Sequence, residues 1–138
     1  MTEKFEFFVV SGKVKDGYDS NGLADVYVKI GYIKKSSEKP EWFLKTPVIK
    51  NSLLPHWAFK QQQALDTSII SNIRIEMWDH DMIGSDDFIG GLTLDVSSIQ
   101  NLTEEGTLLT YHLTNPDAKE EAYMPKATVY LGMSKLKQ

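Results

Sequence analysis

The sequence of 138 residues predicts an all-β fold, an antiparallel sandwich of eight strands. Several short segments alternate apolar and polar residues, as half-buried strands do; residues 26–30 and 73–77 are the clearest. Clusters rich in Gly, Pro, Asn, Asp and Ser separate these segments, as turns do. No segment carries a helical stripe of apolar residues. Short strands at this spacing are typical of a sandwich.

The expected strands are, in chain order, residues 5–10, 26–30, 42–48, 57–61, 73–77, 88–94, 108–113 and 127–133. The first is apolar and aromatic, but it is too short and too charged for a signal peptide. The others are apolar or alternating runs bounded by turn residues, and residues 96–102 allow one short turn of helix. Because there is neither an internal repeat nor a linker, one domain is expected over residues 1–138.

The composition is that of an ordinary globular protein, with 41% hydrophobic and 25% charged residues. The absence of cysteine excludes disulfides and thiolate zinc sites and fits a reducing compartment, so a cytoplasmic location is expected. No run approaches the roughly 20 apolar residues of a membrane span. The net charge of −4 argues against nucleic acid as a partner.

Five aspartates flank the predicted strands. Asp79 and Asp81 follow the strand at 73–77, Asp87 precedes the next one, and Asp19 and Asp25 bracket the connection between the first two strands. Since connections far apart in sequence cluster at one end of a sandwich, these carboxylates are expected to converge. Like charges that close destabilise each other unless a cation is bound. Oxygen ligands without cysteine or paired histidines favour calcium.

Other interpretations of these residues are weaker. The segment from Asp19 also has ordinary turn chemistry, since Asp, Asn and Gly are common turn residues. An EF-hand is rejected, because its twelfth position would be Ile30 or Gly90 where a bidentate Glu is required. The three histidines lack the spacing of a metal set and there is no G-x-S-x-G motif, so the sequence does not favour an enzyme.

The joint pattern resembles the C2 domain family. The resemblance rests on the following residues, in chain order: Asp19, then Asp25 with Val26-Tyr27-Val28-Lys29, Lys45-Thr46, Pro55-His56-Trp57, Trp78-Asp79-His80-Asp81 and Asp87-Phe88-Ile89-Gly90. Each piece is weak alone, but together they are specific and span nearly the whole chain. The resemblance implies an eight-stranded C2-type sandwich. Because the first acidic connection joins the first two strands, it also implies the permuted, phospholipase-like (type II) topology.

The resemblance further implies that the loops at one end of the sandwich bind calcium. The expected ligands are the carboxylates of Asp19, Asp25, Asp79, Asp81 and Asp87, with the backbone carbonyls of Tyr18 and His80. Gly84 stands where some members place a Ser that helps to hold a third ion, so two calcium ions are expected. The sequence assigns no role to the additional Asp86.

The implied partner is an anionic membrane of the phosphatidylserine type. Met82 and Ile83 in the third loop and Leu23 in the first are expected to enter the lipid interface. Tyr27, Lys45 and Trp78 match phosphoinositide-binding positions of protein kinase C-like C2 domains, although Pro47 and Asp86 replace a Lys and an Asn of that set.

Two functions follow from these patterns. The first is calcium-dependent binding to anionic phospholipid, with recruitment from the cytoplasm to the membrane when calcium rises. The second is a C2-like module that binds a protein partner, either without calcium or under its control. The complete set of carboxylates favours the first.

Overall fold

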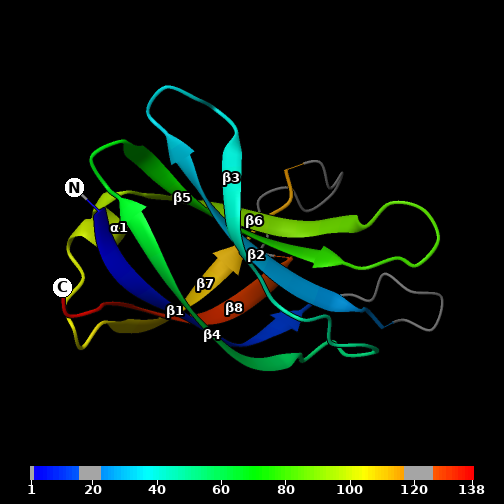
Figure 1. Ribbon diagram of the computed structural model, residues 1–138. Helices are drawn as coiled ribbons and strands as arrows, with labels where there is room; N and C mark the ends of the chain where they lie inside the picture. The colour runs from blue at the N-terminus through cyan, green and yellow to red at the C-terminus, as the bar shows by residue number, and fades with distance from the viewer. Residues whose placement is uncertain (1, 16–22, 117–125) are drawn as a thin grey trace.

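The computed structural model describes residues 2–15, 23–116 and 126–138 (Figure 1). Its elements are β1 (Thr2–Val14), β2 (Val26–Lys34), β3 (Pro40–Lys45), β4 (His56–Asp66), β5 (Ile70–Asp79), β6 (Asp87–Asp95), α1 (Ser97–Gln100), β7 (Thr107–Leu113) and β8 (Ala127–Lys135). The strands form two four-stranded sheets, ordered β4-β1-β8-β7 and β3-β2-β5-β6. All neighbours within each sheet are antiparallel, which confirms the predicted eight-stranded sandwich. The permuted strand order stays a prediction.

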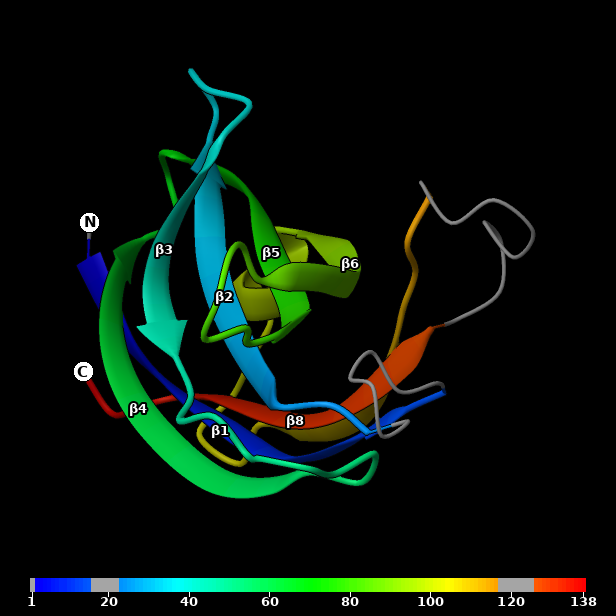
Figure 2. The same ribbon diagram turned by 90° about the vertical axis from the view of Figure 1, so that its right-hand side faces the viewer.

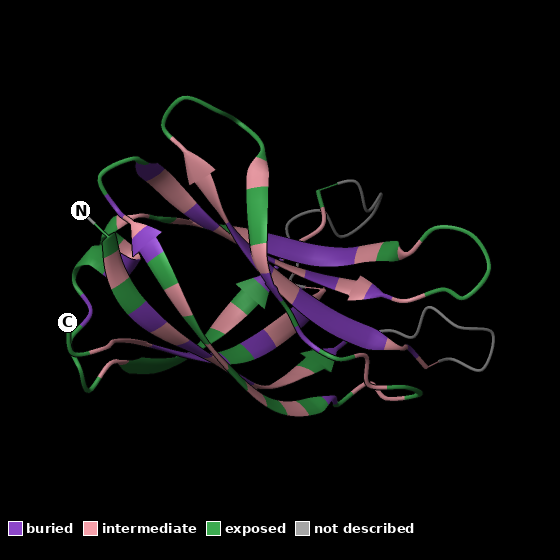
Figure 3. Cartoon of the chain, viewed as in Figure 1, coloured by how far each residue is buried: buried purple, intermediate pink, exposed green. Residues whose placement is uncertain are grey.

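The alternating residues of the two sheets face each other and form the core (Figures 2 and 3). In β1 the buried residues are Phe5, Phe7 and Val9, and in β5 they include Ile73 and Ile75, each with no exposed surface. An irregularity in the pairing of β1 between Val9 and Ser11 shifts the alternation by one residue. Val14 therefore points inward as well, and β1 extends beyond the predicted segment 5–10.

Every predicted strand has somewhat different bounds in the structure, and the segments 42–48 and 57–61 are two examples. The regular strand in the segment 42–48 ends at Lys45. Beyond it, isolated contacts with β2 continue: the Thr46 N–H donates to the Val28 carbonyl, the Thr46 hydroxyl accepts the Val28 N–H at 3.0 Å, and Ile49 pairs with Val26. The segment 57–61 is longer than predicted, since β4 continues to Asp66 along β1. Its Gln-rich continuation has too little apolar alternation to reveal a strand from sequence.

Three connections meet at one end of the sandwich, which is called the binding end below. They are the β1–β2, β3–β4 and β5–β6 connections, of which residues 16–22 lie outside the described part of the chain. Val26 at the start of β2 pairs with Asp79 at the end of β5, and Asp79 pairs with Asp87 at the start of β6. The β3–β4 connection joins them through the hydrogen bond from Ser52 N–H to the Ala24 carbonyl, 2.9 Å long. The strand ends from which these connections leave are therefore neighbours, as predicted (Figure 1).

Candidate functional site

The described acidic residues of the binding end sit at strand ends and in one connection. Asp25 directly precedes β2, Asp79 ends β5 and Asp87 begins β6, while His80 and Asp81 lie in the β5–β6 connection. The predicted ligands Tyr18 and Asp19 lie outside the described residues. The strand register brings Asp25, Asp79 and Asp87 to neighbouring positions, because strands β2, β5 and β6 are adjacent in one sheet.

Backbone hydrogen bonds orient two of these carboxylates. Asp79 is only 2% exposed, and its Oδ1 accepts the Asp25 backbone N–H at 2.7 Å. Asp25 Oδ1 in turn accepts the Asn51 backbone N–H at 2.8 Å, and the Asp25 carbonyl accepts the His80 N–H at 2.7 Å. All three connections are thus tied together through the two aspartates. Burial of a carboxylate costs free energy unless it is hydrogen-bonded or paired with a charge, and the hydrogen bond to Asp79 offsets part of that cost.

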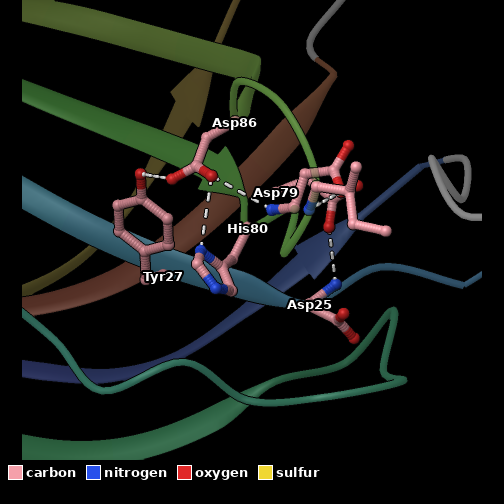
Figure 4. A network of polar contacts seen from close by, with 7 residues as sticks. Asp25, Tyr27, Asp79, His80 and Asp86 are labelled. Atoms are coloured by element: carbon pink, nitrogen blue, oxygen red, sulfur yellow. Dashed lines mark hydrogen bonds and ion pairs between the residues drawn. The ribbon is translucent and has the colours of Figure 1, made fainter.

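Asp86 organises the β5–β6 connection. Its Oδ2 accepts the Tyr27 hydroxyl at 2.5 Å, and its Oδ1 accepts the Asp81 backbone N–H at 3.0 Å and lies 3.3 Å from His80 Nδ1 (Figure 4). The Asp86 side chain is 24% exposed. Sequence reasoning missed this role, because Tyr27 lies 59 residues away and no local pattern links the two.

These contacts hold Asp86 in its charged form. The hydrogen bonds from the Asp81 backbone N–H and from the Tyr27 hydroxyl lower the pKa of Asp86 below its ordinary value. Burial, the hydrogen bond to Asp86 and that carboxylate's charge raise the pKa of Tyr27. Tyr27 is therefore a neutral donor and Asp86 a carboxylate acceptor at neutral pH.

The described residues supply ligand types that fit calcium. The side chains of Asp25, Asp79, Asp81 and Asp87 offer only oxygen, the donor that hard cations prefer. Among residues 2–15, 23–116 and 126–138, no three or more His, Cys, Asp or Glu side chains form a group that could hold a metal ion. The two predicted ligands outside that part of the chain, Tyr18 and Asp19, belong to the same predicted set. The donor chemistry of the described carboxylates is therefore compatible with calcium, but these residues do not by themselves form a metal site.

The tip of the β5–β6 connection is apolar and fully accessible. Met82 is 86% exposed and Ile83 is 87% exposed. The Ile83 backbone N–H donates to Asp81 Oδ1 at 2.9 Å, which fixes the backbone of the tip next to a predicted ligand. Leu23, predicted as a third tip residue, is half-buried. Leu54 in the β3–β4 connection is 68% exposed and was not predicted as a tip residue.

Two of the three predicted phosphoinositide residues, Tyr27 and Lys45, line a groove on the outer face of the sheet that contains β2, and the third, Trp78, contacts the groove residue Lys29. The groove has a volume of about 390 Å³ and is lined by Tyr27, Lys29, Trp42, Phe43, Leu44 and Lys45. Lys45 Nζ lies 4.6 Å from the centre of the Tyr27 ring. Lys29 Nζ lies 4.4 Å from the ring centre of Trp42 and 4.9 Å from that of Trp78. Lys29 and Trp42 are thus two groove residues that the predicted set lacked.

The profile of the C2 domain family matches residues 3–113, so the chain belongs to the C2 domain family. C2 domains are binding modules. The chain is 34% identical over 135 residues to a C2 domain-containing protein of Dictyostelium discoideum, a match that covers 94% of this chain and 65% of that protein.

Solved structures show the same fold. A C2 domain of plant Extended Synaptotagmin 1 superposes with a TM-score of 0.72 at 16% identity, covering 99% of this chain and 97% of that one. The calcium-bound pair of C2 domains of Extended-Synaptotagmin 2 superposes with a TM-score of 0.65 at 21% identity, covering 98% of this chain and 46% of that one. In the described residues, no helix is long and apolar enough to cross a membrane.

Proposed function

We propose that this C2 domain binds anionic phospholipid membranes in response to calcium, with two ions bound at the binding end. The single observation that carries the proposal is the pair Asp25 and Asp79, whose carboxylates the backbone N–H groups of Asn51 and Asp25 orient at the start of the connection that carries the exposed apolar tip. This arrangement serves both halves of the activity, since it combines oxygen ligands for a cation with side chains that can enter lipid.

The residues that would hold calcium are Asp25, Asp79, Asp81 and Asp87, with Asp19 and the carbonyls of Tyr18 and His80 completing the predicted set. When bound, calcium supplies positive charge and coordination positions that phosphate oxygens of the lipid can fill. Without it, the carboxylates repel an anionic surface. The hydrogen bonds of Asp79 and Asp25 already fix the ligand side chains, so the response is a change of charge more than a change of shape.

Met82 and Ile83 add an apolar contact beyond the charged ligands. They lie at the tip and keep 86% and 87% of their surfaces exposed, so both can transfer from water to the lipid interface. The groove that Tyr27 and Lys45 line, next to Trp78, is a second candidate contact for an anionic headgroup, supported by the two lysines that line it, Lys29 and Lys45. In a cell, these contacts would move the domain from the cytoplasm to the membrane surface when calcium rises.

Co-sedimentation with phosphatidylserine-containing vesicles, in calcium and then in chelator, tests the proposal. We expect the protein to pellet only with calcium. Asp79→Asn combined with Asp81→Asn removes two ligand charges while Asn can still accept the Asp25 N–H, so the folded variant should lose calcium-dependent pelleting. The matched control is Asp66→Asn with Asp95→Asn, which changes the net charge equally at the opposite ends of β4 and β6.

Other outcomes assign a different function. Pelleting that is equal in calcium and chelator would remove the calcium switch. No pelleting in either condition would favour the protein-interaction module. Normal calcium affinity in the folded double variant would exclude the predicted ligands.

A further inference from the structure

Two carboxylates border the groove on the outer face of the sheet that contains β2. Asp86 lies beside Tyr27, and Glu76 on β5 is the register partner of Lys29. The side chains of Asp86 and Glu76 are only 24% and 13% exposed. They are therefore held at the border of the groove and are not freely solvated surface charges.

These carboxylates already occupy the hydrogen-bond donors of the groove. The Tyr27 hydroxyl donates to Asp86 Oδ2, and the Trp78 indole N–H donates to Glu76 Oε1 at 3.0 Å. The second Glu76 oxygen accepts Arg74 Nε at 2.9 Å. A phosphate that used the hydroxyl or the indole as a donor would have to displace a partly buried carboxylate, and it would be repelled by that carboxylate's charge.

The cations of the groove remain, but their charge is largely balanced. Lys29 stands between the rings of Trp42 and Trp78, and Lys45 lies over Tyr27. Together with Arg74, these lysines give three positive charges against the two carboxylates, which leaves one net positive charge. This balance suits a headgroup with a single net negative charge, such as phosphatidylserine. It does not suit the clustered phosphates of a phosphoinositide.

We infer that Asp86 and Glu76 determine the headgroup specificity of this groove, admitting singly charged headgroups and discriminating against phosphoinositides. The two carboxylates act by holding the Tyr27 and Trp78 donors and by repelling additional phosphate groups. The inference rests on the proposed membrane binding, because it specifies which lipids the same surface accepts.

The test compares vesicles containing phosphatidylserine with vesicles containing phosphatidylinositol 4,5-bisphosphate, matched in total negative charge and measured in saturating calcium. The wild-type protein should bind the phosphatidylserine vesicles more tightly. Asp86→Asn keeps the size and an acceptor oxygen but removes the charge, so it should raise affinity for the phosphoinositide vesicles about tenfold relative to the phosphatidylserine vesicles. Glu76→Gln should shift the ratio in the same direction.

Asp95→Asn is the matched control, since it makes the same change at the opposite end of strand β6 and should leave the ratio unchanged. The inference is overturned if the wild-type protein binds the two kinds of vesicle equally or prefers the phosphoinositide vesicles, or if neither variant shifts the ratio. Titration calorimetry with soluble inositol 1,4,5-trisphosphate separates this result from a failure of the proposed function, because it needs no membrane. Tighter binding by Asp86→Asn supports the inference even if wild-type protein ignores phosphatidylserine vesicles, and unchanged binding refutes it.

Discussion

Ile83 offers a direct test of membrane insertion. Its side chain is 87% exposed at the tip of the β5–β6 connection, whereas its backbone N–H holds the Asp81 carboxylate. A substitution of the side chain leaves that N–H in place. Ile83→Asp should therefore weaken binding to membranes much more than binding of calcium in solution.

The size of the effect follows from the exposed surface. Complete burial of an Ile side chain is worth about 1.5–3 kcal/mol, and 87% of the Ile83 surface is available for transfer. Since about 1.4 kcal/mol is a factor of ten in an equilibrium constant, the loss of this contact should reduce vesicle affinity about 10- to 70-fold. Repulsion between the new carboxylate and anionic lipid adds to this loss, so it must be measured separately.

Ile69→Asp provides that measurement. Ile69 is 46% exposed in the turn between β4 and β5, at the end of the sandwich opposite the tip, and its replacement changes the net charge equally. The assay is a titration of phosphatidylserine vesicles at saturating calcium, with calorimetric calcium binding measured in parallel. If Ile83→Asp and Ile69→Asp lower vesicle affinity equally, the tip does not enter the membrane. If Ile83→Asp abolishes calcium binding in solution, its effect on vesicles cannot be assigned to insertion.

Three further predictions concern stability. Thr46 is 3% exposed and its hydroxyl accepts the Val28 backbone N–H. Thr46→Val should therefore lower the free energy of unfolding, measured by urea denaturation, by about 1–3 kcal/mol. An unchanged urea midpoint would contradict the role of this bond. Free calcium at about 100 times its dissociation constant should add about 2.7 kcal/mol to the free energy of unfolding for each occupied site and raise the melting temperature, with no shift in the double variant of the calcium ligands. Hydrogen bonds from Ser68 lower the pKa of Asp66 in the folded protein. The charged Asp66 therefore stabilises the fold fully above its unfolded-state pKa, and this stabilisation is lost as the pH falls through the lower folded-state pKa. Asp66→Asn should therefore be less stable than wild type at pH 7, and the difference should disappear in acid; a difference that persists there would refute the assignment.

Much of the fold was predictable because strand periodicity is a local property of the sequence. β5 alternates between buried and partly exposed residues over the predicted segment 73–77, as a strand with one face toward the core does. β2 follows its apolar pattern less strictly, since Tyr27 is buried together with Val26, Val28 and Ile30. The full length of β4 was not predictable from its own residues. Its second half is Gln-rich, and it is a strand because it pairs with β1 from Thr2↔Asp66 onward. Tertiary pairing decided this segment where local pattern was weak.

The candidate site divides in the same way. Asp79 and Asp87 were placed correctly at strand ends because each borders a recognisable strand. The bond from Trp78 to Glu76 had a local signal, since residues two apart on a strand share a face. The bond from Tyr27 to Asp86 had none, because it joins β2 to a connection that only the register of the sheet brings near.

The two surfaces of the proposed membrane contact are physically linked through Asp86. One of its oxygens holds the Asp81 backbone beside the predicted calcium ligands, and the other holds the Tyr27 hydroxyl at the groove. A residue that served only the calcium ligands would need no bond to Tyr27, and one that served only the groove would need none to Asp81. Because a single carboxylate makes both contacts, the geometry of the calcium-binding connection and the charge of the groove cannot be changed independently at this position. Lipid preference and calcium response are therefore expected to vary together in substitutions of Asp86, whereas Glu76, which contacts Arg74 and Trp78, should alter lipid preference alone.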